Sequence, residues 1–508
     1  MKKNTRELRK RKRRISRRLG PRNWSAQDTP MFRAKGIQYE IAERVRGMSC
    51  GGIGAIHALA RDVGLIDAID ERVSLLKTHL PYHESDHVLN IAYNLLTGGQ
   101  CLEDLELLRN DEVYLDALGT QRIPDPTTAG DFCRRFGSED IEALLEAIQT
   151  ARRRVWARQP ESFFEKAVLD VDGTLVPTTG ECKPGMDIAY DGTWGFHPLL
   201  VSLSNTQEPL IIENRSGNRP SHENAAPRID QAIRWCREAG FKSVRVRGDT
   251  DFTQTKHLDR WEDEGVEFVF GIDAMPNLVR IANGLDSKYW KRLARRQKHE
   301  RSGPARERPA RVKEEIVRDR GFKNVRLCSE DVVDVTYRPV ACRRDYRLVI
   351  VRKNLSVERG DQVLFEDIRY FFYLTNVWEG APSEIVFDAN DRCNQENLIA
   401  QLKGGVPALR APVNDLVSNG AYMVMASLAW SLKAWFALLL PETGRWAELH
   451  GHQKRRVLRM EFRSFVNAFI RIPVQIVRQG RRLIYRVLAW NRWLDVFFRG
   501  CRELPLLC

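Results

Sequence analysis

The sequence has no closely spaced pair of cysteines, and this absence excludes several small metal and disulfide folds. Its 10 cysteines are scattered along the chain and form no Cys-x-x-Cys pair. A zinc ribbon needs such pairs, and a disulfide framework needs many cysteines in a short secreted chain. The pattern therefore favours a protein with free thiols in a reducing cytosol.

An uninterrupted hydrophobic run of membrane-spanning length is also missing. Residues 416–440 come nearest, but they are interrupted by Asn419, Ser427, Ser431 and Lys433. A spanning helix needs about 20 predominantly apolar residues, so a buried helix is expected here. The first residues are basic and have no apolar core, so no signal peptide is expected. We therefore expect a cytoplasmic protein without a membrane partner.

A nucleotide-binding loop is absent as well. The glycine-rich stretch Gly51-Gly-Ile-Gly54 is not followed by Lys-Ser/Thr and does not follow a predicted strand. It therefore fits neither a P-loop nor a dinucleotide-binding turn, and no nucleotide cofactor is expected.

Positive charge is abundant. The 508 residues carry a formal net charge of +14, and residues 2–18 alone hold 11 Lys or Arg. Such a balance indicates a polyanionic partner, with nucleic acid favoured over a membrane surface. A charge run cannot bury a core, so residues 1–34 are predicted to be a basic disordered arm that gains affinity for DNA by counterion release.

Residues 35–160 have the apolar spacing of helices and are interpreted as a helical DNA-binding domain. Near its middle, Asp125 can cap a helix that has Pro126 in its first turn, and Arg134 and Arg135 come near the end of that helix. A helix-turn-helix that places these two arginines on DNA is one interpretation. A purely structural helix is the other, because no fingerprint marks the turn.

The pattern changes to strands after residue 160. Residues 161–273 read as three strands followed by alternating helix and strand, which is the ribonuclease H-like layout of a mixed sheet with helices on both faces. Residues 274–380 are interpreted as a β-rich insertion, basic and loop-like in its first half. Residues 381–440 resume the core with a helix that carries Glu396, and residues 441–508 form a basic C-terminal segment with a hairpin near Gly480. The predicted class is α/β.

Acidic residues stand at the ends of two predicted strands. Asp170 and Asp172 end the first strand on one face, because strand side chains alternate, and Asp249 with nearby Asp251 ends another. Acids that converge from separate elements repel one another and usually need a divalent metal. In a basic chain they indicate metal-dependent phosphoryl transfer on nucleic acid.

A third acid comes from the later helix. Steps of four and seven residues return to one helix face, so Arg392, Glu396 and Lys403 are expected on one stripe. The basic pair would contact DNA phosphates, or would form ordinary surface ion pairs with Glu396.

The first acidic motif alone allows a second interpretation. Leu169-Asp170-Val-Asp172-Gly-Thr resembles the first motif of haloacid dehalogenase-type phosphatases, with Asp170 as the nucleophile and Asp172 as the acid/base. In that family a helix follows the first strand, whereas here Pro177, Pro184 and Gly185 lead into another strand. That interpretation also leaves nearly half of the chain without a role.

The full set of motifs resembles the DDE transposases of bacterial insertion sequences. The spacing Arg392-x3-Glu396-x6-Lys403 matches the end of their Tyr-x2-Arg-x3-Glu-x6-Lys signature, although Ala389 stands where the tyrosine is expected. The resemblance is greatest to the group named for insertion sequence 1380, related to the insertion sequence 4 class. It is carried by Leu169-Asp-Val-Asp172-x-Thr174, His197-Pro-Leu-Leu-Val, Gly217-Asn218, Arg247-Gly-Asp249-x-x-Phe252 and Gln395-Glu-Asn-Leu-Ile399.

This resemblance implies an enzyme of cut-and-paste transposition. It would bind terminal inverted repeats and target DNA, most naturally as a homodimer in the bacterial nucleoid, and would cleave and join DNA with two Mg²⁺ ions, for which Mn²⁺ can substitute. Asp172 would bridge both ions, and Asp249 and Glu396 would each hold one; Asp170 and Asp251 are secondary candidates. A non-mobile nuclease of the same fold remains an alternative.

Overall fold

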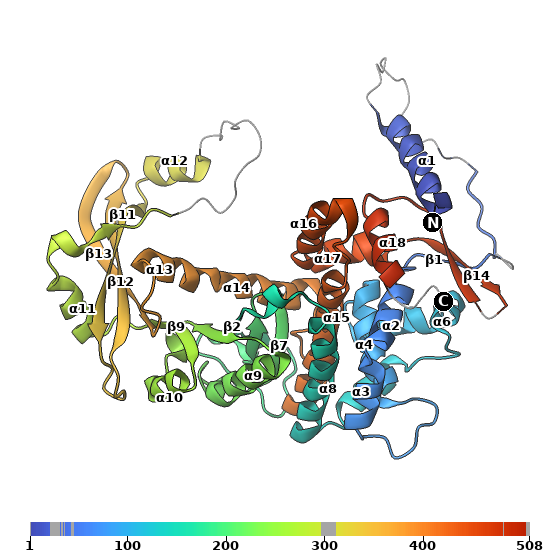
Figure 1. Ribbon diagram of the computed structural model, residues 1–508, viewed down its shortest axis with the longest axis horizontal. Helices are drawn as coiled ribbons and strands as arrows, with labels where there is room; N and C mark the ends of the chain where they lie inside the picture. Colours follow the sequence, from blue (N-terminus) through green and yellow to red (C-terminus); the bar gives the residue numbers. More distant parts are fainter. Residues whose placement is uncertain are drawn as a thin grey trace. The chain divides into compact units, whose positions relative to one another are not determined.

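The computed structural model describes residues 2–20, 31, 34, 36–41, 45–295, 311–480 and 482–503. They form two compact units (Figure 1). The helical unit consists of Met1–Gln159, Val176–Phe196 and Ile399–Cys508, and the sheet unit consists of Pro160–Leu175 and His197–Leu398. Each unit is described by itself.

The sheet unit is built on one mixed sheet of nine strands in the order β10-β11-β12-β13-β9-β8-β2-β6-β7. Its parallel part is β2, β8 and β9, while the neighbouring pairs β2–β6, β6–β7 and β9–β13 are antiparallel. The strands are β2 (Lys166–Gly173), β6 (Leu199–Leu203), β7 (Glu208–Glu213), β8 (Ser243–Gly248), β9 (Val266–Ile272), β10 (Lys291–Arg292), β11 (Lys323–Tyr337), β12 (Tyr346–Arg359) and β13 (Gln362–Thr375). The class predicted from the sequence, α/β with a mixed sheet, is confirmed at this level.

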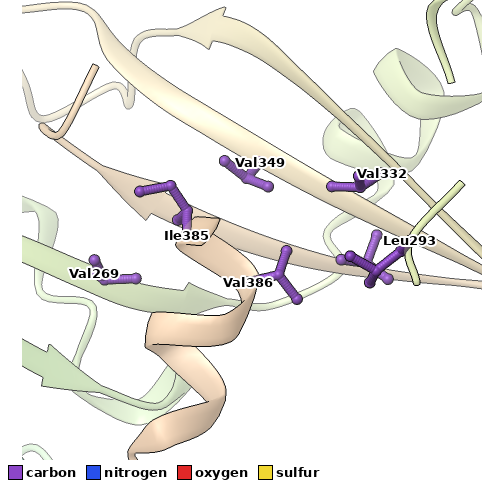
Figure 2. Packing of buried hydrophobic residues seen from close by; sticks show 7 residues of the cluster. Val269, Leu293, Val332, Val349, Ile385 and Val386 are labelled. Atoms are coloured by element: carbon purple, nitrogen blue, oxygen red, sulfur yellow. The ribbon is translucent and has the colours of Figure 1, made fainter. Parts of the chain in front are cut away.

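Helices connect and cover these strands. α9 (Ala225–Ala239) joins β7 to β8 and contacts β2, β6, β7 and β8, and α10 (Leu258–Asp263) joins β8 to β9. α13 (Pro382–Asp391) packs on β9 and β11–β13 through Ile385 and Val386, which lie with Val269, Val332 and Val349 in one buried cluster (Figure 2). Burial of these aliphatic side chains fixes α13, and with it the segment that follows, against the sheet.

The strands within residues 274–380 extend this same sheet. β13 pairs with β9 from Phe372 to Thr375, so β11–β13 continue the sheet beyond β9. These long strands occupy the second half of the segment that the sequence predicted to be β-rich. α11 (Pro276–Asn283) and α12 (Val312–Asp319) accompany them. Much of the basic loop predicted in this region, residues 296–310, lies outside the described residues.

The helical unit surrounds one long apolar helix. α15 (Leu416–Leu438) contacts α2, α4, α7, α8, α16 and α17, and its residues from Ser418 to Leu438 are buried. Among the described residues it is the one helix long and apolar enough to cross a membrane, and it is buried inside the unit. The sequence-based expectation of a buried helix is confirmed. The surrounding helices include α2 (Ile53–Asp62), α3 (Leu65–Arg72), α4 (Glu84–Thr97), α7 (Pro126–Cys133), α8 (Ser138–Trp156), α16 (Ala447–Leu458), α17 (Phe462–Phe465) and α18 (Leu494–Glu503).

The basic arm differs from its prediction where it is described. Residues Lys2–Leu19 form the helix α1 instead of a disordered segment. Lys, Arg and Leu are good helix formers, and Arg11 donates hydrogen bonds to the carbonyls of Val487 and Ala489. These long-range contacts give the helix a partner that sequence periodicity cannot reveal. Most of residues 21–34 lie outside the described residues.

The hairpin predicted near Gly480 is present. β14 (Val474–Gln479) and β15 (Arg482–Val487) pair in antiparallel register, and β14 also pairs with the short strand β1 (Gly47–Met48). The N-terminal and C-terminal segments of the chain are therefore joined within the helical unit.

Lys433 is expected to destabilise the helical unit most below neutral pH. Its ammonium group is fully buried on α15, where it donates to the Leu458 carbonyl (2.7 Å) and lies 3.8 Å from the Trp430 ring centroid. Burial lowers the pKa of Lys433 to about 7. Between pH 7 and the ordinary lysine pKa, the unfolded chain binds more protons than the folded chain does. The loss of folding stability caused by burying the charged ammonium is therefore complete below pH 7 and declines as pH rises. Lys433→Met should therefore gain stability over the parent by ~2 kcal/mol more at pH 6 than at pH 9 in urea unfolding; an equal gain at both would contradict a buried charge.

Candidate active site

Asp172 and Asp249 lie at the same edge of the sheet. β2 and β8 are parallel neighbours in which Asp170 is paired with Arg247, so the residues two positions further along both strands are also neighbours. Asp172 occupies the end of β2, and Asp249 follows β8 directly and caps a short 3₁₀ helix by accepting from the Asp251 N–H. Carboxyl ends of adjacent parallel strands bring these two acids together, as the sequence predicted.

Arg392 bridges the two acids. Its guanidinium donates from one Nη to Asp172 Oδ2 at 3.1 Å, and its other Nη lies 4.0 Å from Asp249 Oδ2. In the structure it lies against the acidic pair and offsets part of its charge, and the contact with DNA phosphates predicted from the sequence stays a prediction. A guanidinium is suited to this place because its fork presents several donors in one plane.

Glu396 follows Arg392 by one helical turn and is exposed. It lies in the first turn of α14 (Cys393–Ala400), and its negative charge contributes to the raised pKa of Asp172. The structure thus brings Glu396 into electrostatic range of the pair. The expected single helical stripe is not formed, because α13 ends at Asp391 and Lys403 lies in a π-helical turn, Gln401–Gly405. Lys403 belongs to the helical unit, and its contact with DNA stays a prediction.

The site holds its carboxylates in an environment that disfavours their charge. Burial raises the pKa of Asp172 to about 6; Arg392 opposes this shift, while Asp249 and Glu396 add to it. Burial likewise raises the pKa of Asp249, with Arg392 opposing and Asp251 and Asp273 adding. For both carboxyl groups, burial therefore outweighs the stabilisation of the charged form by Arg392.

This donor set fits a hard divalent cation. Oxygen ligands from carboxylates are what Mg²⁺ prefers, and a bound cation would favour the charged form of Asp172, whose pKa is raised first by burial and then by Asp249 and Glu396. Among the residues that the structure describes, no group of three or more Asp, Glu, His or Cys side chains is placed closely enough to hold a metal ion. Arg392 occupies the space between Asp172 and Asp249, so metal binding requires its guanidinium to shift.

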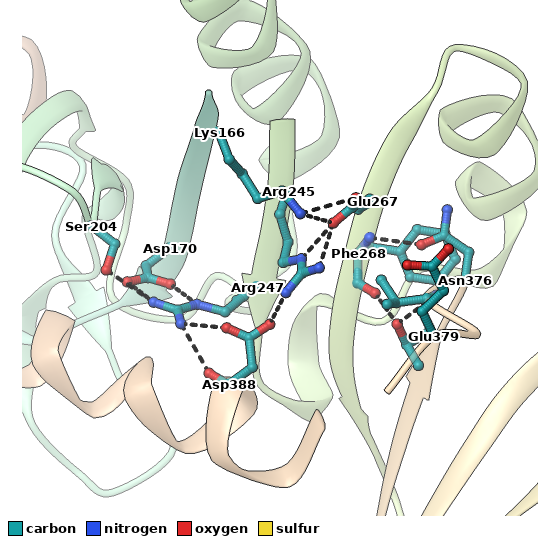
Figure 3. A network of polar contacts seen from close by, with 12 residues as sticks. Lys166, Asp170, Ser204, Arg245, Arg247, Glu267, Phe268, Asn376, Glu379 and Asp388 are labelled. Carbon is teal, nitrogen blue, oxygen red and sulfur yellow. Dashed lines mark hydrogen bonds and ion pairs between the residues drawn. The ribbon is translucent and has the colours of Figure 1, made fainter. Parts of the chain in front are cut away.

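Asp170 lies in a buried ion-pair network (Figure 3). Arg247 donates to both oxygens of Asp170 (2.7 and 2.9 Å) and to Ser204 Oγ (2.9 Å), and the side chains of the two ion-pair partners are only 4% and 1% exposed. A fully paired, buried carboxylate cannot reach a substrate. Asp170 therefore holds β2 against β8 in this structure.

The same network reaches the segment that carries Arg392. Arg247 also donates to the side chain and the carbonyl of Asp388 on α13, both at 2.9 Å. Arg245 joins Asp388 to Glu267, and Lys166 also contacts Glu267 (Figure 3). One arginine thus connects the three elements that supply Asp172, Asp249 and Arg392.

Gln395 fixes the start of α14. Its side-chain amide donates to the carbonyls of Asp170 (2.8 Å) and Leu200 (3.2 Å), on the adjacent strands β2 and β6. Sequence analysis did not assign roles to Arg247, Asp388 and Gln395. The spacing could have indicated a role for the first two. Arg247 is two residues before Asp249 at the end of a strand, and Asp388 is four residues before Arg392 at the end of a helix, so each shares a face with a site residue.

Gly173 is required by a close approach at the end of β2. A Cβ at this position would lie 2.7 Å from His197 Nε2, and the His197 ring is held in place by its Nδ1 contact with the Arg219 carbonyl (2.9 Å). Any side chain at position 173 would push this ring away. The glycine next to Asp172 therefore keeps the strand end compact.

Arg134 and Arg135 lie at the end of α7, as the sequence predicted. Asp125 caps that helix by accepting from the Thr128 N–H, and Pro126 is its first residue. Both arginines are exposed, and Arg134 forms an ion pair with Asp131 and donates to Asn414 Oδ1 (2.8 Å). Arg134 is thus engaged within the helical unit, and its role in DNA binding stays a prediction.

The phosphatase interpretation is not supported by this geometry. Its nucleophile would be Asp170, which is buried and paired. Its fold would place a helix after the first strand. Here β2 is followed by a small sheet of β3 (Val176–Pro177), β4 (Asp187–Ile188) and β5 (Trp194–Phe196), and then by the antiparallel strand β6.

Comparison with known proteins decides the family. Residues 44–503 match the family model described as transposase DDE domain, group 1. The chain belongs to this family of DDE transposases. Its members are nucleotidyl-transfer enzymes that act with divalent metals.

Two further comparisons complete this description. The solved structures that resemble the chain include a piggyBac transposase synaptic complex with hairpin DNA, with a TM-score of 0.36 and 10% identity over 84% of this chain and 81% of that one. No curated protein matches the sequence. The assignment of residues to the site therefore rests on the family and on the geometry described above.

Proposed function

We propose that the chain is the transposase of an insertion sequence, and that it binds the ends of the element and catalyses metal-dependent cleavage and strand transfer. The observation that carries this proposal is the meeting of Asp172, Asp249 and Arg392, from β2, β8 and the end of α13, with Glu396 one turn away. These residues are separated by up to 224 positions in the sequence, and the family match spans all of them.

The catalytic core is proposed to be ribonuclease H-like. Support comes from the order of five strands: β2, β6 and β7 follow one another in antiparallel pairs, and β8 and β9 add to the other side of β2 in parallel. Strands β10–β13 would then be the β-rich insertion, added beyond β9. The family resemblance further favours the group named for insertion sequence 1380.

Asp172, Asp249 and Glu396 are proposed to hold two Mg²⁺ ions, with Mn²⁺ as a substitute. When bound, the ions would activate the attacking oxygen and stabilise the leaving oxygen at phosphorus. Arg392 holds the two aspartates close together and, once displaced from them, has a guanidinium free to contact a DNA phosphate. Asp251 keeps Asp249 oriented through its backbone N–H.

The partners are proposed to be the terminal inverted repeats and the target DNA. A homodimer would bring two ends together, and the site of action would be the bacterial cytoplasm at the nucleoid. A nuclease of the same fold that does not move DNA would use the same acids, so joining of ends distinguishes the two.

Removing metal should abolish the reaction but not the binding. The full chain is incubated with a labelled duplex that carries one inverted repeat from beside its gene, with Mg²⁺, Mn²⁺ or EDTA. We expect nicking that frees a 3′-hydroxyl, and joining to a plasmid, with either metal and neither product in EDTA, whereas the gel shift persists. Cleavage in EDTA would contradict the proposed acids, and cleavage without joining would indicate the non-mobile nuclease.

A further inference from the structure

Charge is distributed unevenly along the chain. Residues 35–160, the helical region predicted to bind DNA, contain 14 Lys or Arg and 20 Asp or Glu, a net charge of −6. Residues 441–508 contain 14 Lys or Arg and only 5 Asp or Glu, a net charge of +9. Because phosphate contacts dominate DNA affinity, the field of the protein attracts DNA to the C-terminal segment rather than to the acidic helices.

The C-terminal segment contains a groove suited to a phosphate backbone. It has a volume of about 640 Å³ and lies between the end of α16, the turn from α17 into the π-helical residues Val466–Ile470, and the start of α18. α16 and α18 are tied together by a hydrogen bond from Arg499 to Gln453, and the elements lie side by side in Figure 1. The polar residues that line the groove include Arg456, Arg459, Ser464, Asn467, Asn491 and Arg492.

Three arginines in this groove have no acidic partner among the described residues: Arg456, Arg459 and Arg492 are all exposed, and none forms an ion pair there. Two of them share one ring, since Arg456 lies 5.3 Å and Arg492 lies 5.8 Å from the centroid of Trp493. Both guanidinium groups are thus held by cation–π contacts with one buried indole. With Arg459 they give the groove three positive charges that a polyanion would offset.

We infer that this groove binds consecutive phosphates of double-stranded DNA. The arginines supply charge-assisted donors, and the exposed Ser464 hydroxyl and Asn467 amide supply neutral ones, which is the donor mixture that positions a duplex without reading its sequence. Trp493 is 9% exposed, so it supports the arginines and does not stack on bases. The inference rests on the proposed function, because DNA is the polyanion that a transposase binds.

The test measures DNA affinity against salt with the full chain in EDTA, so that no cleavage occurs. The triple variant Arg456→Gln/Arg459→Gln/Arg492→Gln is compared with the parent on one labelled inverted-repeat duplex. Each lost phosphate contact removes ~0.9 from the slope of log affinity against log salt, so the slope should fall by about 2 to 3 and binding should weaken at least ~10-fold near 0.1 M salt. The matching Arg→Lys triple should recover most of the affinity.

A control triple removes the same charge elsewhere. Arg61→Gln/Arg72→Gln/Arg122→Gln alters three exposed arginines of the acidic helical region and should leave the slope unchanged. An equal fall of the slope in both triple variants, or no fall in the groove variant, would contradict DNA binding by the groove. Because Arg456 and Arg492 contact Trp493, Arg459→Glu alone serves as a second variant, with thermal unfolding as the folding check. If the parent itself binds no DNA, the proposed function fails instead.

Discussion

Replacing Asp172 by asparagine is expected to leave no measurable cleavage of a DNA end. Asp172 is the acid closest to Arg392, and Asp249 and Glu396 both influence its charge, so it is central to the cluster. An amide keeps the shape of the side chain but removes the charge that holds a hard cation, and a loss of roughly 10³-fold or more is expected. Single-turnover cleavage of an inverted-repeat duplex in Mg²⁺ measures it, with gel shift as the control for binding.

The matched control is Asp170→Asn, two residues earlier on the same strand. Because Asp170 is buried and paired with Arg247, its amide variant should retain measurable cleavage despite lower stability. Asp249→Asn and Glu396→Gln should behave like Asp172→Asn. Cleavage by Asp172→Asn, together with its absence in a folded Asp170→Asn, would exchange the roles assigned to the two aspartates.

Replacing Arg247 by methionine should destabilise the sheet unit by ~3–5 kcal/mol. The change removes a buried guanidinium and leaves the carboxylates of Asp170 and Asp388 without their shared partner. Urea unfolding, followed by the fluorescence of tryptophans such as Trp235 and Trp261 in this unit, gives the free energy.

A double variant tests whether the cost comes from stranded charge. In Arg247→Met/Asp170→Leu, both charged partners are replaced by apolar side chains. The free energy of unfolding of this double variant should fall by at least about 1 kcal/mol less than the sum of the falls in the two single variants. Strict additivity would show that Arg247 and Asp170 are not coupled. Arg247→Lys, which keeps the charge but loses the bidentate geometry, should fall between the parent and Arg247→Met.

Local patterns predicted much of the sheet unit. The alternation of side chains placed Asp172 at a strand end, and the parallel neighbour with Asp249 followed from the order of strands and helices. The buried helix at 416–438, the capped helix after Asp125 and the C-terminal hairpin also follow from short-range signals. In each case the feature is determined within about 25 residues of the chain.

Long-range contacts account for what the sequence did not reveal. The contact of Arg392 with Asp172 could not be predicted, because the two residues are 220 positions apart in the sequence. The end of α13 at Asp391 and the hydrogen bonds of Gln395 to β2 and β6 set the position of Arg392. In residues 2–19, Arg11 donates to the carbonyl groups of Val487 and Ala489, more than 470 residues away, and no local pattern reveals this contact. The acidic character of residues 35–160 was present in the composition, and a count by segment rather than for the whole chain would have found it.

The sequence distance between the bridged side chains also governs when they can meet during folding. The Asp170–Arg247 pair spans 77 residues, whereas the contact between Asp172 and Arg392 spans 220. Because closing a longer loop costs more chain entropy and requires later residues to be synthesised, β2 and β8 can pair well before α13 arrives. A nascent or truncated chain that ends before residue 380 would hold two facing aspartates with no arginine between them. We therefore expect Arg392 to join the two aspartates only after the strands that carry them have paired.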